Sequence, residues 1–133
     1  MIIVLDTSVL IAAFVTTSGV CADVLKLSVR EHRLVLSDYI LDEYARKLRE
    51  KFGLTAAEAL AERRELNLSA ILVKPAPVAP EVCRDPADAA ILGTALAAKA
   101  HMLVSVDKDL LDLQTHGGID IVNPREFFRR THT

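Results

Sequence analysis

MIIVLDTSV, residues 1–9, is the stretch that decides the fold of this chain. Apolar and largely β-branched residues fill positions 2–5 and stop at Asp6, which two hydroxyl residues follow. A short apolar run of this kind is typical of a strand that is buried on both faces in a parallel sheet. In open α/β sheets the ligand crevice lies beyond the carboxyl ends of the strands. The motif therefore predicts a buried strand that places Asp6 in such a crevice.

A second stretch, VSVDKD at residues 104–109, repeats this arrangement far along the chain, with an apolar strand that leads to Asp107. Each aspartate could instead be the N-cap of the helix that follows it, a role that strand-end aspartates often take. For Asp6 alone, capping and ligand binding are equally good explanations. Two matched strand ends that present acids to one crevice favour a cation site.

Strand-like and helical segments alternate along the chain. The pattern predicts strands at residues 2–5, 33–36, 71–73, 102–106 and 120–122, and helices at 8–14, 20–31, 38–51, 55–68, 87–99, 108–113 and 124–130. Such alternation favours a parallel sheet covered by helices on both faces. The proline-rich residues 74–80 predict a stiff loop rather than a domain boundary, so residues 1–133 form one domain. We therefore expect a single-domain, three-layer α/β/α sandwich with a central parallel sheet of about five strands.

Composition and charge exclude some classes of protein function. The formal net charge of −2 excludes the broad basic surface of a protein that binds nucleic acid by charge alone. The apolar content of 51% is high, which predicts spare apolar surface for a partner chain. No apolar run reaches the roughly 18 residues of a membrane span, and the N-terminus lacks a basic leading segment, so we expect no membrane contact and a cytoplasmic protein. Cys21 and Cys83 indicate neither a disulfide framework nor a zinc site.

The nearly apolar helix expected at residues 87–99 begins beside two further acids. Asp85 is spaced as its N-cap, Pro86 as its first residue and Asp88 as its third. Capping explains Asp85 well. It explains Asp88 less completely, because aspartate reaches back to the cap less well than Glu or Gln. Asp88 is therefore the stronger candidate ligand of the two.

Glu43 has the weakest pattern among the acids. It flanks an apolar helical stripe and is spaced to pair with Lys47, which favours a surface ion pair. Three or four carboxylates converge only with a cation or bound protons, and oxygen-only donor sets suit Mg²⁺ or Mn²⁺. The sequence contains no HExxH pair, no Gly-rich phosphate loop and no nucleophile elbow, so metal-activated water is the natural nucleophile.

Four blocks carry these acids in a fixed order: IVLDTSVLIAA at residues 3–13, SDYILDEYARKL at 37–48, RDPADAAILGTALAAKAHMLVSVDKDLL at 84–111 and IVNPREFF at 121–128. Together they resemble the PIN domain family, and especially its VapC-like members, the toxins of toxin–antitoxin pairs. The resemblance implies an acidic quartet that binds Mg²⁺ or Mn²⁺ and performs catalysis, made of Asp6, Glu43, Asp88 and Asp107. It also implies residues that support the acids or the waters of the metal, at Ser8, Ser105, Asp85 and Asp109. The two basic residues nearest the acids in sequence, Arg84 and Lys108, are candidates for contacts with RNA phosphates.

The same resemblance implies a function. PIN domains of this type are expected to act as metal-dependent endoribonucleases that cleave single-stranded or loop RNA with a metal-activated water. VapC-like members imply an antitoxin protein as partner and a homodimer as the assembly. Val106 occupies a position where many relatives have Gly, which changes the backbone beside Asp107 without removing a ligand.

Two alternatives stay open on the sequence. A receiver-like signalling domain also gathers acids around Mg²⁺, but it needs a phosphate-accepting aspartate at the end of a middle strand, and residues 71–73 run into Lys74 and Pro75 instead. A PIN-like scaffold module without catalytic activity would use the spare apolar surface. The intact acids argue against that alternative.

Overall fold

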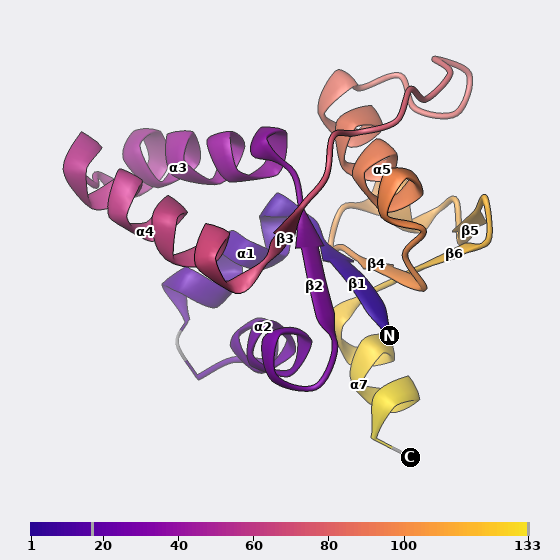
Figure 1. The fold of residues 1–133 in the computed structure, drawn as a ribbon, viewed down its shortest axis with the longest axis horizontal. Helices are drawn as coiled ribbons and strands as arrows, with labels where there is room; N and C mark the ends of the chain where they lie inside the picture. The colour runs from indigo at the N-terminus through magenta and orange to yellow at the C-terminus, as the bar shows by residue number, and fades with distance from the viewer. Residues whose placement is uncertain (17, 133) are drawn as a thin grey trace.

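The computed structural model describes residues 1–16 and 18–132 of the chain, and Figure 1 shows strands surrounded by helices. Within these residues the strands are β1 (Ile2–Leu5), β2 (Arg33–Leu36), β3 (Ile71–Leu72), β4 (Met102–Val104), β5 (Thr115–His116) and β6 (Ile119–Val122). The helices are α1 (Thr7–Val15), α2 (Val20–Arg30), α3 (Asp38–Phe52), α4 (Ala56–Ser69), α5 (Pro86–Ala98), α6 (Lys108–Leu111) and α7 (Pro124–Thr131). Every strand and helix expected from the sequence is present, with ends shifted by at most two residues.

One sheet holds all six strands in the order β3-β2-β1-β4-β6-β5. All neighbours pair in parallel except β5, which is antiparallel to β6. The expected α/β fold class is confirmed, but the sheet has six strands rather than about five. The sequence analysis missed β5 because a strand of two residues shows no alternating pattern.

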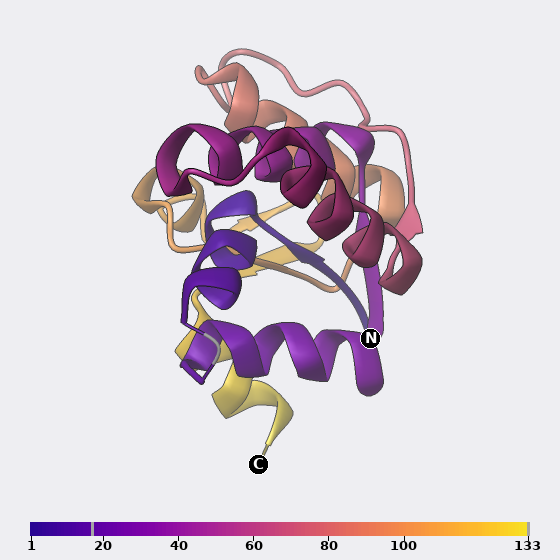
Figure 2. The same ribbon diagram turned by 90° about the vertical axis from the view of Figure 1, so that its left-hand side faces the viewer.

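Helices cover both faces of this sheet, as expected. Helix α5 packs on β1, β2 and β4, whereas α2 packs on β2 and against α7. Helices α3 and α4 pack against each other beside the sheet, and Figure 2 shows α1 between α3 and α2. Helix α5 buries residues all round, including Ile91, Leu92 and Ala95, which explains why its sequence is apolar on every side.

The direction of the strand order reverses between β1 and β4. The chain first builds β2 and β3 on one side of β1 and then returns to place β4 on the other side. The two strands end together, because the backbone N–H of Asp6 donates to the carbonyl oxygen of Val104 at 2.9 Å. Ligands of open α/β sheets bind at such a reversal, beyond the carboxyl ends of the strands.

Among the described residues, no single helix is both long and apolar enough to cross a membrane. Helices α1 and α2 reach the length and apolar composition of a membrane span only when taken together, and their axes are bent by 112° relative to each other. Each buries side chains in the core, such as Val9 and Leu10 of α1 and Val24 of α2, so packing accounts for their apolar character.

Candidate metal centre

Asp6 is held at the end of β1 by bonds to two elements. Its side chain is only 4% exposed, and one carboxylate oxygen, Oδ1, faces the backbone N–H of Ser8 at 3.5 Å, as the N-cap of α1. The other oxygen, Oδ2, accepts a hydrogen bond from Ser105 Oγ at 2.6 Å. Asp6 therefore caps α1 and also takes part in a polar site, so the two roles do not exclude each other.

Ser105 connects the ends of β1 and β4. Its hydroxyl donates to Asp6 and accepts the backbone N–H of Asp107 at 2.9 Å. That second bond turns the chain out of the sheet, which is why β4 ends at Val104 instead of residue 106. Asp107 then caps α6, because its Oδ1 accepts the N–H of Asp109 at 2.9 Å.

Three carboxylates converge at this point. Asp88, Asp107 and Asp109 each offer one oxygen, and these oxygens all lie within 4.8 Å of one another. Asp88 is buried in the first turn of α5, Asp107 is half-buried and Asp109 is exposed. The sequence analysis gave Asp109 a supporting role, whereas the structure places it in the closest group of acids.

Asp85 lies at the edge of the group as the N-cap of α5, where its Oδ1 accepts the N–H of Ala87 at 2.8 Å. This agrees with the cap expected from the sequence. Asp6 and Glu43 do not belong to the group of three close carboxylates.

Burial and repulsion from neighbouring carboxylates shift two of the acids, Asp88 and Asp6, toward their protonated forms. Desolvation, a hydrogen bond with Asp107 and the charges of Asp107, Asp85 and Asp6 raise the pKa of Asp88 to about 7. Burial also raises the pKa of Asp6, although the hydrogen bond from Ser105 opposes this rise. Neighbouring carboxylates with raised pKa values gain from a cation that compensates their charge, so the electrostatics favour cation binding.

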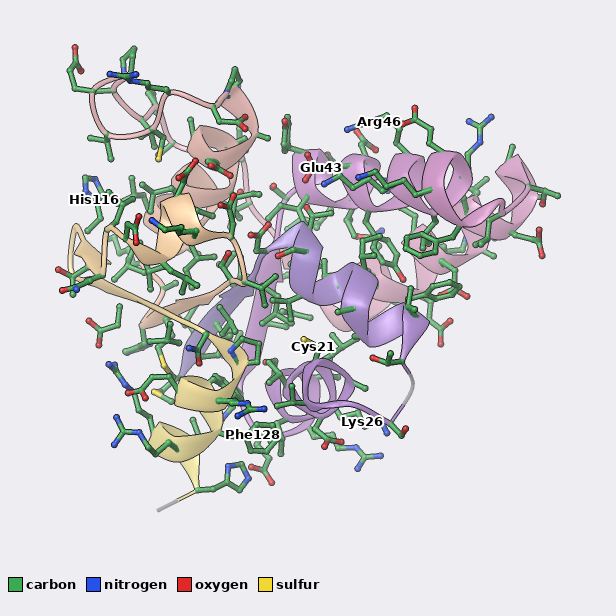
Figure 3. The ribbon with its side chains drawn as sticks, turned by 180° about the vertical axis from the view of Figure 1, so that it is seen from behind. Cys21, Lys26, Glu43, Arg46, His116 and Phe128 are labelled. Atoms are coloured by element: carbon green, nitrogen blue, oxygen red, sulfur yellow. The ribbon has the colours of Figure 1, made fainter. Side chains whose placement is uncertain are left out.

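Glu43 lies on α3 and is 8% exposed, so the expected surface location is wrong. The basic side chain within 4 Å of it is Arg46, at 3.9 Å, rather than Lys47. Figure 3 labels both residues on the same stretch of α3. Glu43 is buried because α3 packs against α1 and α5, a tertiary contact that the helical pattern does not encode.

Tyr39 connects Glu43 with the aspartates. Burial raises the pKa of its hydroxyl, and so do the nearby charges of Glu43, Asp85 and Asp88, which Arg46 partly offsets. Its side chain is nonetheless 39% exposed. The sequence analysis did not single out Tyr39, although its position one helical turn before Glu43 was a usable signal.

The donor set fits a hard divalent cation. The close ligands are carboxylate oxygens, which Mg²⁺ and Mn²⁺ prefer. Beside Asp6, the hydroxyls of Thr7 and Ser8 are buried and have no hydrogen-bond partner among the described residues. Since buried polar atoms normally have partners, these two hydroxyls are suited to bind waters of a bound ion. Ser8 therefore stays a candidate for the supporting role expected from the sequence.

Arg84 and Lys108, the two candidates for contact with RNA phosphates, differ in their surroundings. Arg84 is exposed in the loop directly before Asp85, the N-cap of α5, and it forms no ion pair with a described residue within 4.0 Å. Lys108 directs its ammonium to Asp112 Oδ2 at 2.7 Å, and its side chain is 85% exposed. Arg84 is thus the better placed of the two to contact a phosphate at the acids.

Comparisons with known proteins agree with this architecture. The sequence model of the PIN domain family matches residues 2–109. No curated protein matches the chain.

Similar solved structures share the fold at low sequence identity. VapBC2 from Rickettsia felis, bound to a DNA fragment from its promoter, has a TM-score of 0.65 at 13% identity, covering 92% of this chain and 98% of that one. VapBC-1 from nontypeable Haemophilus influenzae has a TM-score of 0.65 at 17% identity, with 94% and 99% covered. DNA-bound VapBC from Salmonella typhimurium has a TM-score of 0.65 at 20% identity, with 93% and 98% covered.

These findings decide between the fold families considered from the sequence. Strand β3 lies at an edge of the sheet with both residues exposed, and it leads to Val73 and Lys74, so it is not the middle strand with a phosphate-accepting aspartate that a receiver domain needs. The matched region contains all four acids of the implied quartet. The chain belongs to the PIN domain family.

Proposed function

We propose that this chain is a divalent-metal-dependent endoribonuclease that hydrolyses single-stranded or loop RNA. The observation that carries the proposal is the convergence of Asp88, Asp107 and Asp109 within 4.8 Å, beside the buried Asp6, at the strand ends of a PIN fold. This arrangement supports phosphodiester hydrolysis, since metal-dependent nucleases use clustered carboxylates to hold their ions.

Asp6, Asp88 and Asp107 hold Mg²⁺ or Mn²⁺ in this proposal, with Glu43 approaching from α3. A bound divalent ion lowers the pKa of water and stabilises the leaving oxygen. Ser105 fixes the orientation of Asp6 through its 2.6 Å hydrogen bond. Asp109 and Asp85 add negative charge around the ion, and Arg84 positions the substrate phosphate at the mouth of the site.

The test of catalysis is cleavage of a single-stranded RNA in Mg²⁺ or Mn²⁺ by the wild type and by Asp6→Asn and Asp107→Asn variants. We expect each variant to lose activity by at least about 100-fold, because removal of a group that stabilises the transition state typically costs that much. Asp112→Asn removes an exposed acid that pairs with Lys108, so this matched control keeps full activity. Equal cleavage by wild type and both variants would refute the proposal.

Metal binding can be tested without turnover. Calorimetric titration of Mn²⁺ into the Asp88→Asn variant should show clearly weaker binding than the wild type, with the fold intact by circular dichroism. The amide keeps the shape of the side chain and removes its charge. Unchanged Mn²⁺ affinity would exclude Asp88 as a ligand.

We also propose that the protein is the toxin of a toxin–antitoxin pair, supported by the likeness of its fold to three VapBC structures. A groove of about 380 Å³ offers a surface for the antitoxin, and its walls are apolar residues of α1, α2, α3 and α4 together with two acids. Among the lining residues are Phe14, Leu25, Tyr44, Glu62 and Glu65. An amphipathic antitoxin helix with basic residues would complement this apolar surface and its carboxylates.

Co-expression with the product of the neighbouring reading frame tests the partner. We expect a stable complex that inhibits RNA cleavage, and we expect Glu62→Lys combined with Glu65→Lys to weaken it. A double Arg64→Glu, Lys51→Glu variant changes two charges outside the groove and should leave the complex intact. Failure of any neighbouring small protein to bind would contradict the toxin assignment while leaving the nuclease proposal standing.

A further inference from the structure

Tyr39 presents an aromatic ring at the border of the acidic site. It follows Asp38 at the start of α3 and is 39% exposed. The other tyrosine, Tyr44, is 3% exposed, so only Tyr39 can offer a tyrosine ring to a ligand. Tyr39 lines a hollow together with Glu43, and the charges of Glu43, Asp85 and Asp88 help to raise the pKa of its hydroxyl.

The ring forms a wall of two hollows. One hollow of about 320 Å³ lies along α3 and is lined by Tyr39, Asp42, Glu43 and Arg46. The other, of about 450 Å³, is lined by Asp38, Tyr39 and residues 72–75.

The far wall of the second hollow is held rigidly. The backbone N–H of Val73 donates to Leu36 at 3.0 Å, and the N–H of Ala76 donates to the carbonyl oxygen of Gly93 in α5 at 2.9 Å. These bonds fix residues 73–76 between β2 and α5. A group that enters the hollow would therefore lie beside Tyr39 and beside a segment that is held in place by these bonds.

One cation lies at each hollow. Arg46, whose side chain is 56% exposed, lines the first hollow, where it pairs with Glu50 at 3.2 Å and lies 3.9 Å from Glu43. The exposed Lys74 lines the second hollow. Acids line both hollows as well, and two of them, Asp38 and Asp42, are paired with Arg63. Single-stranded nucleic acids bind where aromatic rings stack with bases and neighbouring cations contact the phosphates, and an exposed ion pair such as that of Arg46 is weak enough for a phosphate to compete with it.

We propose that Tyr39 is the stacking platform for a nucleobase of the single-stranded RNA, next to the phosphate at the acids, with Arg46 and Lys74 contacting the phosphates on either side. This inference rests on the proposed nuclease function and assigns the residue that positions its substrate. Stacking tolerates every base, so the platform gives affinity for unpaired RNA rather than a base sequence preference. A base in a duplex is stacked on its neighbours and cannot stack on Tyr39.

The test compares Tyr39→Ala, which removes the ring, with Tyr39→Phe, which keeps it. All proteins carry Asp107→Asn to prevent cleavage, and a labelled single-stranded RNA hexamer is titrated in Mg²⁺ with fluorescence anisotropy as the readout. We expect Tyr39→Ala to weaken binding about 5- to 100-fold, the range for loss of one stacked base, and Tyr39→Phe to bind within about twofold of the parent. Phe52→Ala removes an equally exposed aromatic residue from the other end of α3 and should change nothing.

A second readout uses the tyrosine itself. The chain has no tryptophan and two tyrosines, so RNA that stacks on Tyr39 should quench the tyrosine emission, and this quenching should vanish in Tyr39→Phe. Unchanged affinity in Tyr39→Ala, or equal weakening in Tyr39→Phe, would overturn the proposal. If the wild type cleaves no RNA, the proposed function fails on its own, because the binding comparison does not depend on turnover.

Discussion

At the scale of single residues, the acids of the candidate centre also organise the backbone. Asp6, Asp85 and Asp107 are the N-caps of α1, α5 and α6, and Asp88 lies in the first turn of α5. Three helix N-termini therefore point at one place, and their partial positive charge lowers the cost of gathering carboxylates there. From the sequence, capping and metal binding looked like competing explanations of these residues. The structure shows that capping by one carboxylate oxygen leaves the other oxygen for other partners.

The pKa of Asp88 makes stability depend on pH. Its pKa is about 7 in the folded protein and 3.8 ordinarily, so between these values the folded state keeps a proton that the unfolded state has lost. The metal-free protein should therefore lose stability as the pH rises from 3.8 to about 7, by at most about 1.4 kcal/mol per pH unit for this one proton. Urea denaturation in EDTA at pH 5 and pH 7.5 measures the effect.

Asp88→Asn should flatten this dependence, because the amide does not titrate. Saturating Mg²⁺ should also reverse the trend in the wild type, since the ion binds the ionised carboxylates and stabilises the folded state at the higher pH. The same pH dependence in wild type and variant would show that Asp88 is not the group responsible.

Ser105→Ala tests the residue that connects the two strand ends. It leaves the buried Asp6 Oδ2 and the N–H of Asp107 without their partner, so we expect a loss of about 1–3 kcal/mol in unfolding free energy. Affinity for Mn²⁺ should fall about 10- to 100-fold, as is usual when a residue that orients a ligand is lost. Ser28→Ala is the matched control, because Ser28 is equally buried but donates to Val24 within α2. Wild-type metal affinity in Ser105→Ala would argue against the positioning role.

At the scale of elements, the sequence predicted what depends on local signals and missed what depends on packing. The capping residue Asp85 located the start of α5 to within one residue, and apolar runs located β1 and β2 to the residue. The sequence did contain a signal for the hairpin of β5 and β6, the pair Gly117-Gly118. In the structure these glycines have φ values of 58° and 82°, which glycine adopts readily. The burial of Glu43 could not be predicted, because it arises from the contact of α3 with α5 rather than from the pattern of α3.

Gly93 lets the loop of residues 73–76 approach α5. A Cβ at this position would lie 2.2 Å from the carbonyl oxygen of Ala76. Gly93→Ala should therefore cost about 1–3 kcal/mol of unfolding free energy, as overpacking does, although alanine in a helix interior is ordinarily about 1 kcal/mol better than glycine. Thermal denaturation measures the change in unfolding free energy. Ala97→Gly, at an exposed position of the same helix, measures the effect of helix propensity alone. A stabilised Gly93→Ala variant would mean that the loop is not held as described.

At the scale of the whole molecule, the order of the strands brings Asp6 and Asp107 together. The sequence predicted that each follows a strand, and the structure places those strands side by side. The proposed RNA substrate and partner protein could not be identified from this pattern, because their recognition depends on surfaces that the strand pattern does not specify. The spare apolar surface expected from composition is present on α4 and at the start of β3, where Leu60, Leu68 and Ile71 are exposed.

We predict that this surface joins two copies of the chain in the expected homodimer. Leu68 is 82% exposed, and Leu68→Glu should place a charge in the interface and convert the dimer into a monomer. Analytical ultracentrifugation measures the change. Val15→Glu alters an apolar residue that is 49% exposed on α1 and should leave the dimer intact. A wild type that is monomeric, or a dimer insensitive to Leu68→Glu, would contradict this assignment.

The hydrogen bond between Ser105 and Asp6 joins residues that are 99 positions apart. During synthesis on the ribosome, β1 can pair with β2 before β4 and the acids around it have been made. A nascent chain that has not reached Ser105 and Asp107 therefore lacks the assembled acids, and any activity that depends on them begins only after these residues have emerged. A protein that attacks RNA would gain from this delay, because the ribosome that makes it is itself built of RNA.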